Sequence, residues 1–216
     1  MKNLEQYIEH TLLKQDATKE ELQKLYDEAK KYNFLGVCVN PINVKNAKEA
    51  LKDSKVKVVT VVGFPLGASR SDVKAFETQR AVEDGADEID MVLNVSKMKD
   101  KDYDFVKKDI EMVKKACADK PLKVILETDL LEKKEIEKAC GLCVEAKADF
   151  VKTSTGFVKN GVGAKVEDVA LMAKIVKPHG LGVKASAGIR DKEKAILMIE
   201  AGADRLGTSS GVAIVS

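Results

Sequence analysis

Short β-rich runs alternate with amphipathic helical segments along this chain, and this alternation limits the folds that it can adopt. One example of a helical segment is residues 18–32, TKEELQKLYDEAKKY, which begin with a threonine cap and an acidic first turn. Seven β-rich runs are clear, and an eighth precedes the first long helix. The eight runs are 7–13, 36–40, 56–64, 88–95, 123–131, 149–157, 182–189 and 204–211. Strands and helices that alternate at this spacing form parallel βαβ units.

Eight strand–helix units predict an α/β fold, the (β/α)8 TIM barrel, in a single domain over residues 1–216. The alternative is an open, doubly wound sheet with helices on both faces. No GxGxxG motif follows the first clear strand, and polar residues gather at the C-terminal end of nearly every strand. A barrel brings all of those ends into one ring, whereas an open sheet gathers only a few. The barrel is therefore the predicted fold.

The composition excludes several classes of partner. The formal net charge is +2, aromatic residues make up 5% of the chain, and no compact basic patch appears, so no nucleic-acid partner is predicted. No apolar run approaches the roughly 20 residues that span a bilayer, and residues 1–10 lack a signal-peptide core. We therefore expect a cytoplasmic protein without a membrane partner.

Lys152 and Lys184 lie inside strand-like runs, DFVKTSTGF and GVKASAGI, whose other residues are mostly small or apolar. A buried ammonium group costs free energy unless it is paired, so cores rarely keep one without a use. The two lysines are 32 positions apart, about one strand–helix–strand repeat. This spacing predicts one site in which the charge of one amine makes the other nucleophilic.

Side chains alternate along a strand, so residues two positions apart share a face. The faces that carry polar groups are Phe150/Lys152/Ser154, Lys184/Ser186, Asp90/Val92/Asn94 and Ile125/Glu127. If these faces point inward, the mouth of the barrel receives two lysines, one or two carboxylates and several hydroxyl groups. The alternative is that Asp90 only neutralises one buried lysine in a structural ion pair. That alternative leaves a surplus ammonium group unexplained.

Metal chemistry fits the sequence poorly. His10 and His179 are the only histidines and lie in no cluster with ligand spacing, so no metal and no cofactor is predicted. His10 could line the mouth, or it could serve as a cap or packing residue, and His179 is expected to be structural. Cys140 and Cys143 have CxxC spacing but lie in a helical segment, where we expect them to pack.

Three turns rich in glycine and hydroxyl residues follow the sixth, seventh and eighth runs: TSTGF, SAGIRD and GTSSG. Backbone N–H groups in such turns bind phosphate, and barrels commonly use the loops after strands seven and eight for this purpose. The predicted phosphate-binding residues are Thr155, Gly156, Ala187, Gly188, Gly207, Ser209 and Ser210.

With these features assembled, the chain resembles the deoxyribose-phosphate aldolase family of class I (Schiff-base) aldolases. The matching blocks, in order from about Ile8, are IEHTLL, GVCVNP, VVGFPLG, DEIDMVLN, KVILET, DFVKTSTGF, GVKASAGIRD and RLGTSSG. The resemblance implies reversible cleavage of 2-deoxy-D-ribose 5-phosphate to acetaldehyde and D-glyceraldehyde 3-phosphate. This lyase reaction belongs to deoxyribonucleotide and carbohydrate degradation and uses no metal.

The resemblance also implies catalytic roles. The lysine of the KTSTG block, Lys152, would form the imine with the substrate. Lys184, from the KASAG block, would lie beside it and favour its neutral, nucleophilic form. Asp90 would hold Lys184 and a water molecule in a proton relay.

Several residues depart from the family pattern or support the site. Glu9 stands where the first block often has aspartate, and it keeps the charge but adds a methylene group. Phe157 replaces a phosphate-binding lysine of some members, so backbone groups and Arg190 would carry more of that binding. Thr11 and Cys38 are expected near the mouth; the Cys38 thiol could react with an unsaturated aldehyde, although packing is the favoured interpretation.

Two other functions stay open from sequence. One is a Schiff-base aldolase that acts on a different phosphorylated sugar or keto acid. The other is a catalytically silent barrel that senses a sugar phosphate, but phosphate binding alone would not require two buried lysines. The predicted partners are small sugar phosphates and aldehydes. Because members of the family that the chain resembles are often dimers, a homodimer is also predicted.

Overall fold

The computed structural model describes residues 3–216, and its strands close into one parallel barrel in the order β1 to β8, with β8 paired to β1. The strands are β1 (Ile8–Leu12), β2 (Gly36–Val39), β3 (Lys57–Val62), β4 (Glu88–Val92), β5 (Leu122–Ile125), β6 (Phe150–Lys152), β7 (Gly182–Ser186) and β8 (Arg205–Thr208). Seven of the eight predicted runs contain one whole strand, and the run 123–131 contains β5 except for its first residue, Leu122. The predicted (β/α)8 fold is confirmed; the predicted domain of residues 1–216 also includes Met1 and Lys2, which lie outside the described residues.

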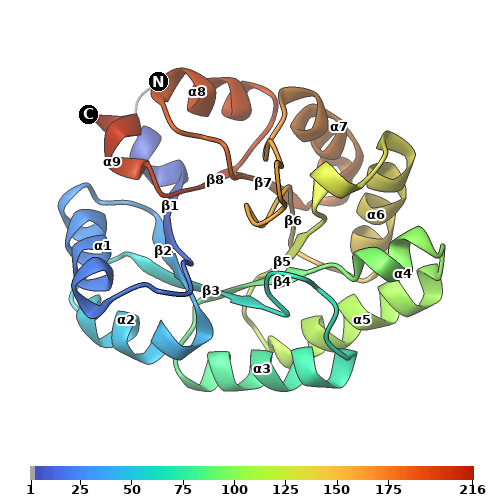
Figure 1. Ribbon diagram of the computed structural model, residues 1–216, viewed down its shortest axis with the longest axis horizontal. Coiled ribbons are helices and arrows are strands. Elements are labelled where there is room, and N and C mark those ends of the chain that lie inside the picture. Colours follow the sequence, from blue (N-terminus) through green and yellow to red (C-terminus); the bar gives the residue numbers. More distant parts are fainter. Residues whose placement is uncertain (1–2) are drawn as a thin grey trace.

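Helices surround the barrel as an outer layer, which Figure 1 shows in a view along the barrel axis. They are α1 (Lys19–Lys31), α2 (Val44–Ala50), α3 (Ser71–Glu83), α4 (Val95–Lys99), α5 (Tyr103–Ala116), α6 (Lys133–Glu145), α7 (Val166–Val176), α8 (Lys192–Glu200) and α9 (Gly211–Val215). Short 3-10 turns are η1 (Leu4–Tyr7), η2 (Pro41–Asn43), η3 (Thr128–Leu130) and η4 (Lys177–His179). Within residues 3–216, no helix combines the length and hydropathy of a bilayer span.

Helix α1 begins where the sequence predicts it. The Thr18 side chain accepts the Glu21 N–H, and the Glu21 carboxylate accepts the Thr18 N–H, which forms a capping box. Its apolar face buries Leu22, Leu25 and Tyr26 against the barrel. Local chemistry and the hydrophobic pattern therefore agree on this helix.

Residues between the barrel and the helices make up most of the core. Cys140 and Cys143 are fully buried on the inner side of α6, which confirms that they pack. His10 also faces this layer: its Nε2 lies 2.8 Å from Glu28 of α1, and its ring lies 5.2 Å from that of Phe34. His10 therefore packs outside the barrel wall and does not line the mouth, because Glu9 and Thr11, its neighbours in β1, occupy the opposite face.

An aspartate repeats at the N-terminal ends of β4, β6 and β8, the edge of the barrel opposite the mouth. The three copies and their partners are Asp87 with Val58, Asp149 with Leu122, and Asp204 with Val183. Each carboxylate accepts its partner's N–H at 2.7 to 2.9 Å, and each aspartate N–H donates to the same partner's carbonyl oxygen. A lysine from the element before the partner's strand completes each unit: Lys48, Lys114 and Lys177, respectively. These units join β3 to β4, β5 to β6 and β7 to β8, so they tie three pairs of neighbouring strands together at the lower edge of the barrel.

We predict that Asp149→Ala lowers the free energy of unfolding by about 1–3 kcal/mol, because the Leu122 N–H and the Lys114 ammonium lose their acceptor. Asp149→Asn keeps an acceptor for the N–H and should recover part of the loss. Asp119→Ala, which removes a mostly exposed carboxylate paired with Lys120, is the matched control. Urea unfolding curves measure all three; equal midpoints for Asp149→Ala and Asp119→Ala would contradict the role of the repeat.

Candidate active site

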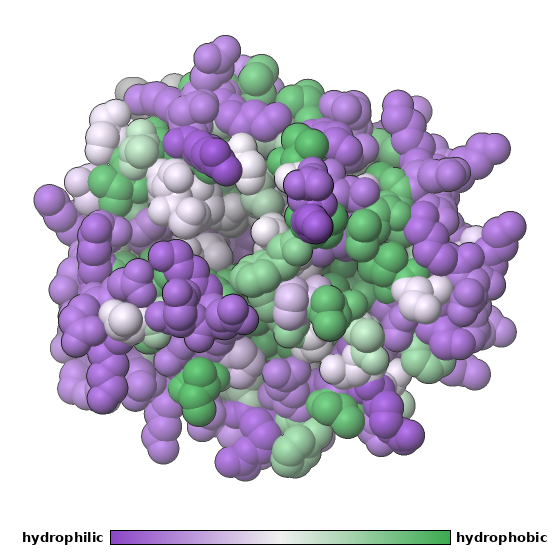
Figure 2. All heavy atoms as spheres, in the orientation of Figure 1, coloured by the Kyte–Doolittle hydropathy of each residue, from purple (hydrophilic) through white to green (hydrophobic). Residues whose placement is uncertain are grey.

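Lys152 ends strand β6 and reaches the floor of a cavity of about 300 Å3 at the C-terminal mouth of the barrel. Its side chain is 5% exposed. The cavity is lined by Thr11, Leu12, Leu13, Lys14, Lys152, Ser154, Thr155, Gly156, Phe157, Ser186, Ala187, Gly188, Ile189, Arg190, Gly207, Thr208 and Ser209. In Figure 2, hydrophilic side chains cover much of the periphery, whereas pale and green side chains gather nearer the centre.

Asp90 of β4 binds three lysines inside the barrel. Its Oδ2 lies 2.7 Å from the Nζ of Lys152 and 2.7 Å from the Nζ of Lys184, and its Oδ1 lies 3.0 Å from the Nζ of Lys123. Register explains this meeting, because Lys152 pairs with Lys184 across β6 and β7, and Asp90 pairs with Lys123 across β4 and β5. The three residues that the sequence predicts as catalytic thus lie in one cluster.

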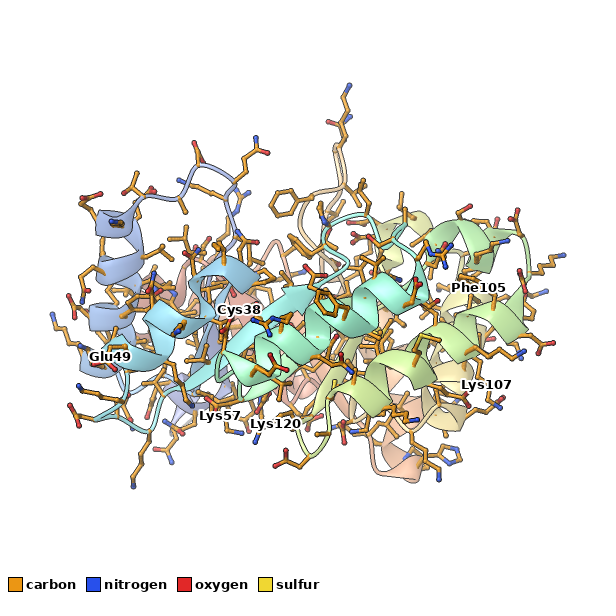
Figure 3. All side chains as sticks on the ribbon, turned by 90° about the horizontal axis from the view of Figure 1, so that it is seen from below. Cys38, Glu49, Lys57, Phe105, Lys107 and Lys120 are labelled. Atoms are coloured by element: carbon orange, nitrogen blue, oxygen red, sulfur yellow. The ribbon has the colours of Figure 1, made fainter. Side chains whose placement is uncertain are left out.

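Two further carboxylates complete this cluster. Glu9 of β1 forms a close ion pair with Lys184 and lies 3.5 Å from Lys123. A Glu88 carboxylate oxygen lies 2.5 Å from the Nζ of Lys123, and the other lies 2.6 Å from the Nζ of Lys57. Lys57 is labelled in Figure 3, at the lower edge of the barrel. The expectation of a surplus ammonium group was therefore wrong, since the barrel interior, within residues 3–216, holds three carboxylates (Glu9, Glu88 and Asp90) for its three lysines.

Burial and charge act in opposite directions on these groups. Burial by itself would raise the pKa of Asp90, but the charges of Lys123, Lys152 and Lys184 hold it well below its usual range. Burial by itself would lower the pKa of Lys184, but Asp90 and Glu9 outweigh it and raise that pKa. Lys184 therefore stays protonated and Asp90 stays ionised.

Lys152 differs from the other two interior lysines in access and in partners. It lines the cavity, whereas Lys123 and Lys184 are fully buried. It contacts one carboxylate oxygen, which it shares with Lys184, whereas Lys184 also pairs with Glu9 and Lys123 with Glu9 and Glu88. Lys152 is thus the interior amine that an incoming molecule can reach.

Sequence reasoning missed Lys123 and Glu88. Lys123 shares a strand face with Ile125 and Glu127, which were assigned to the interior, so the same alternation could have identified it. Glu88 likewise shares a face with Asp90. Lys123 stands at the start of its run, two residues after Pro121, where lysines are usually exposed.

Most of the predicted phosphate-binding residues reach the cavity. Gly156, Ala187, Gly188, Gly207 and Ser209 line it, but Ser210 does not, and the Ser210 N–H donates to Thr208 Oγ1 at 2.9 Å. Gly207 also gives Lys184 room, because a Cβ there would lie 3.0 Å from Lys184 Cε.

Thr155 lines the cavity, but its two donors are already used. Its N–H donates to Glu127 Oε1 at 3.0 Å, and its hydroxyl donates to Glu127 Oε2 in a close contact. Burial raises the pKa of Glu127, and the two hydrogen bonds from Thr155 oppose that effect. Thr155 therefore cannot supply the phosphate donors expected from the sequence while this contact persists.

The supporting residues are divided between the cavity and the core. Thr11 and Arg190 line the cavity, and the Thr11 hydroxyl donates to the Glu9 carbonyl oxygen at 2.9 Å. Cys38, labelled in the interior in Figure 3, is fully buried among Leu13, Val59 and Val61. Burial raises the pKa of the Cys38 thiol, which favours packing over reactivity.

Phe157 forms an aromatic contact at the mouth. Its ring lies 5.1 Å from the ring of Phe64, edge to face, and half of the residue is exposed. Where a lysine of some family members would stand, this chain therefore has an apolar wall. Among residues 3–216, no group of three or more histidine, cysteine or acidic side chains is arranged to hold a metal ion.

Comparisons with known proteins agree with this geometry. A family model described as DeoC/LacD family aldolase matches residues 4–216. Deoxyribose-phosphate aldolase of Brevibacillus brevis is 58% identical over 99% of this chain and 96% of the relative. The Thermococcus gammatolerans protein of the same name is also 58% identical, over 99% of this chain and 95% of the relative.

Solved structures give the same result. The tetrameric deoxyribose phosphate aldolase from Aeropyrum pernix is similar with a TM-score of 0.88 and 35% identity, over 98% of this chain and 89% of that one. A structure described as QR15, an aldolase, has a TM-score of 0.94 and 44% identity, over 99% and 95% of the two chains.

We predict that Glu88 stabilises the fold above pH 4.5 and that this contribution is lost as the pH falls toward 2. Burial would raise the pKa of Glu88, but Lys123 and Lys57 outweigh it and lower the pKa from 4.5 to about 2, which corresponds to about 3 kcal/mol. Glu88→Gln should therefore be less stable than the parent at pH 7, with a gap that narrows between pH 4.5 and 2. Urea unfolding across this range tests the prediction; Glu49→Gln, which alters an exposed pair with Lys52, is the control. A gap independent of pH would contradict it.

Proposed function

Because the chain belongs to the DeoC/LacD family of aldolases, we propose that it cleaves 2-deoxy-D-ribose 5-phosphate to acetaldehyde and D-glyceraldehyde 3-phosphate through a Lys152 imine. The observation that carries this proposal is the position of Lys152. It is the interior lysine that lines the cavity, and it shares one Asp90 oxygen with the protonated Lys184. The names of relatives that are 58% identical support the substrate.

The first half of the reaction is imine formation. The neutral amine of Lys152 attacks the C1 aldehyde of the open-chain sugar and gives a carbinolamine, which loses its hydroxyl as water. Asp90 Oδ2, 2.7 Å from both amines, lies where it can exchange protons between Lys152 and Lys184. Lys184 is the protonated member of this pair, because Asp90 and Glu9 raise its pKa, and the ion pair with Glu9 holds its side chain in place.

The second half is the cleavage of the C2–C3 bond. The protonated imine withdraws electrons, so loss of the C3 hydroxyl proton sends the bonding electrons into an enamine on Lys152 and releases glyceraldehyde 3-phosphate. Protonation of the enamine at C2 and hydrolysis by water then release acetaldehyde and restore the amine. The closed floor of ion pairs keeps the proton exchange within Asp90 and its lysines.

The phosphate is expected at the β7–β8 side of the mouth. Gly188, Gly207 and Ser209 line the cavity there, and Arg190 adds a cation at its wall. Ser210 and Thr155 have donors that are already engaged, so we assign them no phosphate contact.

A cytoplasmic location stays a prediction, and so does a homodimer. The exposed apolar side chains Val73 and Phe76 of α3 offer a candidate contact for that dimer.

We predict that borohydride reduction in the presence of acetaldehyde attaches a two-carbon group to Lys152, which peptide mass mapping will locate. Lys152→Leu should lose the adduct and reduce cleavage to the uncatalysed rate, because no other interior lysine lines the described cavity. Lys134→Leu, which removes an exposed lysine of α6, is the control and should keep both. Cleavage that survives in Lys152→Leu would refute the proposed mechanism.

Lys184→Met should separate imine formation from turnover. We expect this variant to form the acetaldehyde adduct on Lys152 but to lose about 10²–10⁴-fold in kcat, because its buried acid is gone. Adduct yield and kcat are measured on the same preparation, and thermal unfolding checks that it is folded. A kcat close to that of the parent would exclude Lys184 from the proton transfers.

A further inference from the structure

Glu127 follows β5 and has an unusual backbone for a residue with a side chain. Its φ and ψ are both 61°, in the left-handed region, which costs on the order of 1–2 kcal/mol for a residue other than glycine. The residue is also 3% exposed, so its carboxylate is buried. A strained backbone and a buried carboxylate at one position call for a partner that offsets both costs.

That partner is Thr155, which lines the cavity beside Lys152. Both carboxylate oxygens of Glu127 accept hydrogen bonds from it, one from the N–H and one from the hydroxyl. Thr155 Oγ1 also accepts the Phe157 N–H at 3.1 Å. A hydroxyl group has one hydrogen and two lone pairs, so one lone pair of Thr155 Oγ1 has no partner among residues 3–216.

We propose that Glu127 is a positioning residue that makes Thr155 an acceptor only, so that Thr155 recognises a hydroxyl group of the substrate and not its phosphate. The inference deepens the proposed function and rests on it. A phosphate oxygen accepts hydrogen bonds and is repelled by an acceptor backed by a carboxylate, whereas a substrate O–H can donate to the free lone pair. D-glyceraldehyde 3-phosphate has one free hydroxyl group, at C2, and this group would donate a hydrogen bond to Thr155 Oγ1.

Asp129, a second acidic residue close to Glu127, provides a comparison at the same side of the cavity. Glu127 and Asp129 both line a smaller cavity of about 120 Å3, which shares Gly156, Ala187, Gly188 and Arg190 with the larger one. Asp129 accepts the Gly163 N–H at 2.7 Å and pairs with Lys165 at 3.3 Å, and no contact with Thr155 is among its interactions in the described chain. Asp129→Asn therefore changes a charge beside the same cavity without changing the hydrogen-bond state of Thr155.

The test uses the aldol direction, with acetaldehyde and one of two acceptors. D-glyceraldehyde 3-phosphate carries the 2-hydroxyl, and 3-oxopropyl phosphate is the same molecule without it. The parent protein should prefer the first acceptor in kcat/KM by about tenfold or more, because the analogue leaves the Thr155 lone pair unmatched.

Glu127→Gln should reduce this preference to within about threefold. The glutamine amide would donate to Thr155 Oγ1, so the threonine hydroxyl would turn its hydrogen elsewhere and lose its acceptor-only state. Thr155→Val should remove the preference as well, and Asp129→Asn should keep it. In the Thr155→Val background, Glu127→Gln should have no further effect on the ratio, because its influence passes through Thr155.

Two outcomes would overturn the inference. One is a parent protein that uses both acceptors equally well; the other is a Glu127→Gln variant that keeps the parent's preference while only kcat or the melting temperature falls. If Glu127→Gln does not fold, Thr155→Val decides, and a preference that survives there counts against the inference. Borohydride trapping of acetaldehyde on Lys152 needs no acceptor, so it tests the aldolase proposal separately. If the adduct forms but the protein shows no preference between the two acceptors, the aldolase proposal stands and only the inference about Thr155 fails. If the parent protein forms no adduct, both fail.

Discussion

The Asp90 carboxylate is the constraint on which the interior of this barrel depends, because three ammonium groups converge on its two oxygens. No lysine could be buried there alone, since an isolated buried charge costs many kcal/mol. Glu9 and Glu88 balance the remaining charge. These residues come from β1, β4, β5, β6 and β7, so the ion pairs form only when the sheet has closed and brought β1 across to β7.

The two ends of the barrel divide stability and chemistry. At the lower edge, the repeated aspartates tie β3 to β4, β5 to β6 and β7 to β8 through paired backbone hydrogen bonds and a lysine. At the mouth, the cavity is surrounded by glycine-rich turns and by residues with a left-handed backbone conformation, such as Glu127 and Ala187. Because the lower edge holds the strands, the mouth can keep strained turns and a reachable amine at Lys152.

Sequence patterns predicted the fold and the centre of the site well. Eight strand runs, the α1 cap at Thr18 and the convergence of Lys152, Lys184 and Asp90 followed from alternation and spacing. Lys123 was missed because an exposed and a buried lysine at the start of a strand look alike in sequence. His10 faces the helices and not the mouth, and both Thr155 donors are engaged by Glu127, which lies in the loop after β5.

The sequence by itself determined which strands exist and which residues share a face, because strand periodicity depends on neighbours along the chain. It also placed polar residues at the strand ends that a barrel must gather into one ring. The tertiary structure alone decided how many charges meet at Asp90, which of its lysines can be reached, and whether Thr155 offers a hydrogen or a lone pair. Those properties depend on contacts between β1, β4, β5, β6 and β7, and a hydrogen-bond partner distant in sequence leaves no periodic signal in the chain.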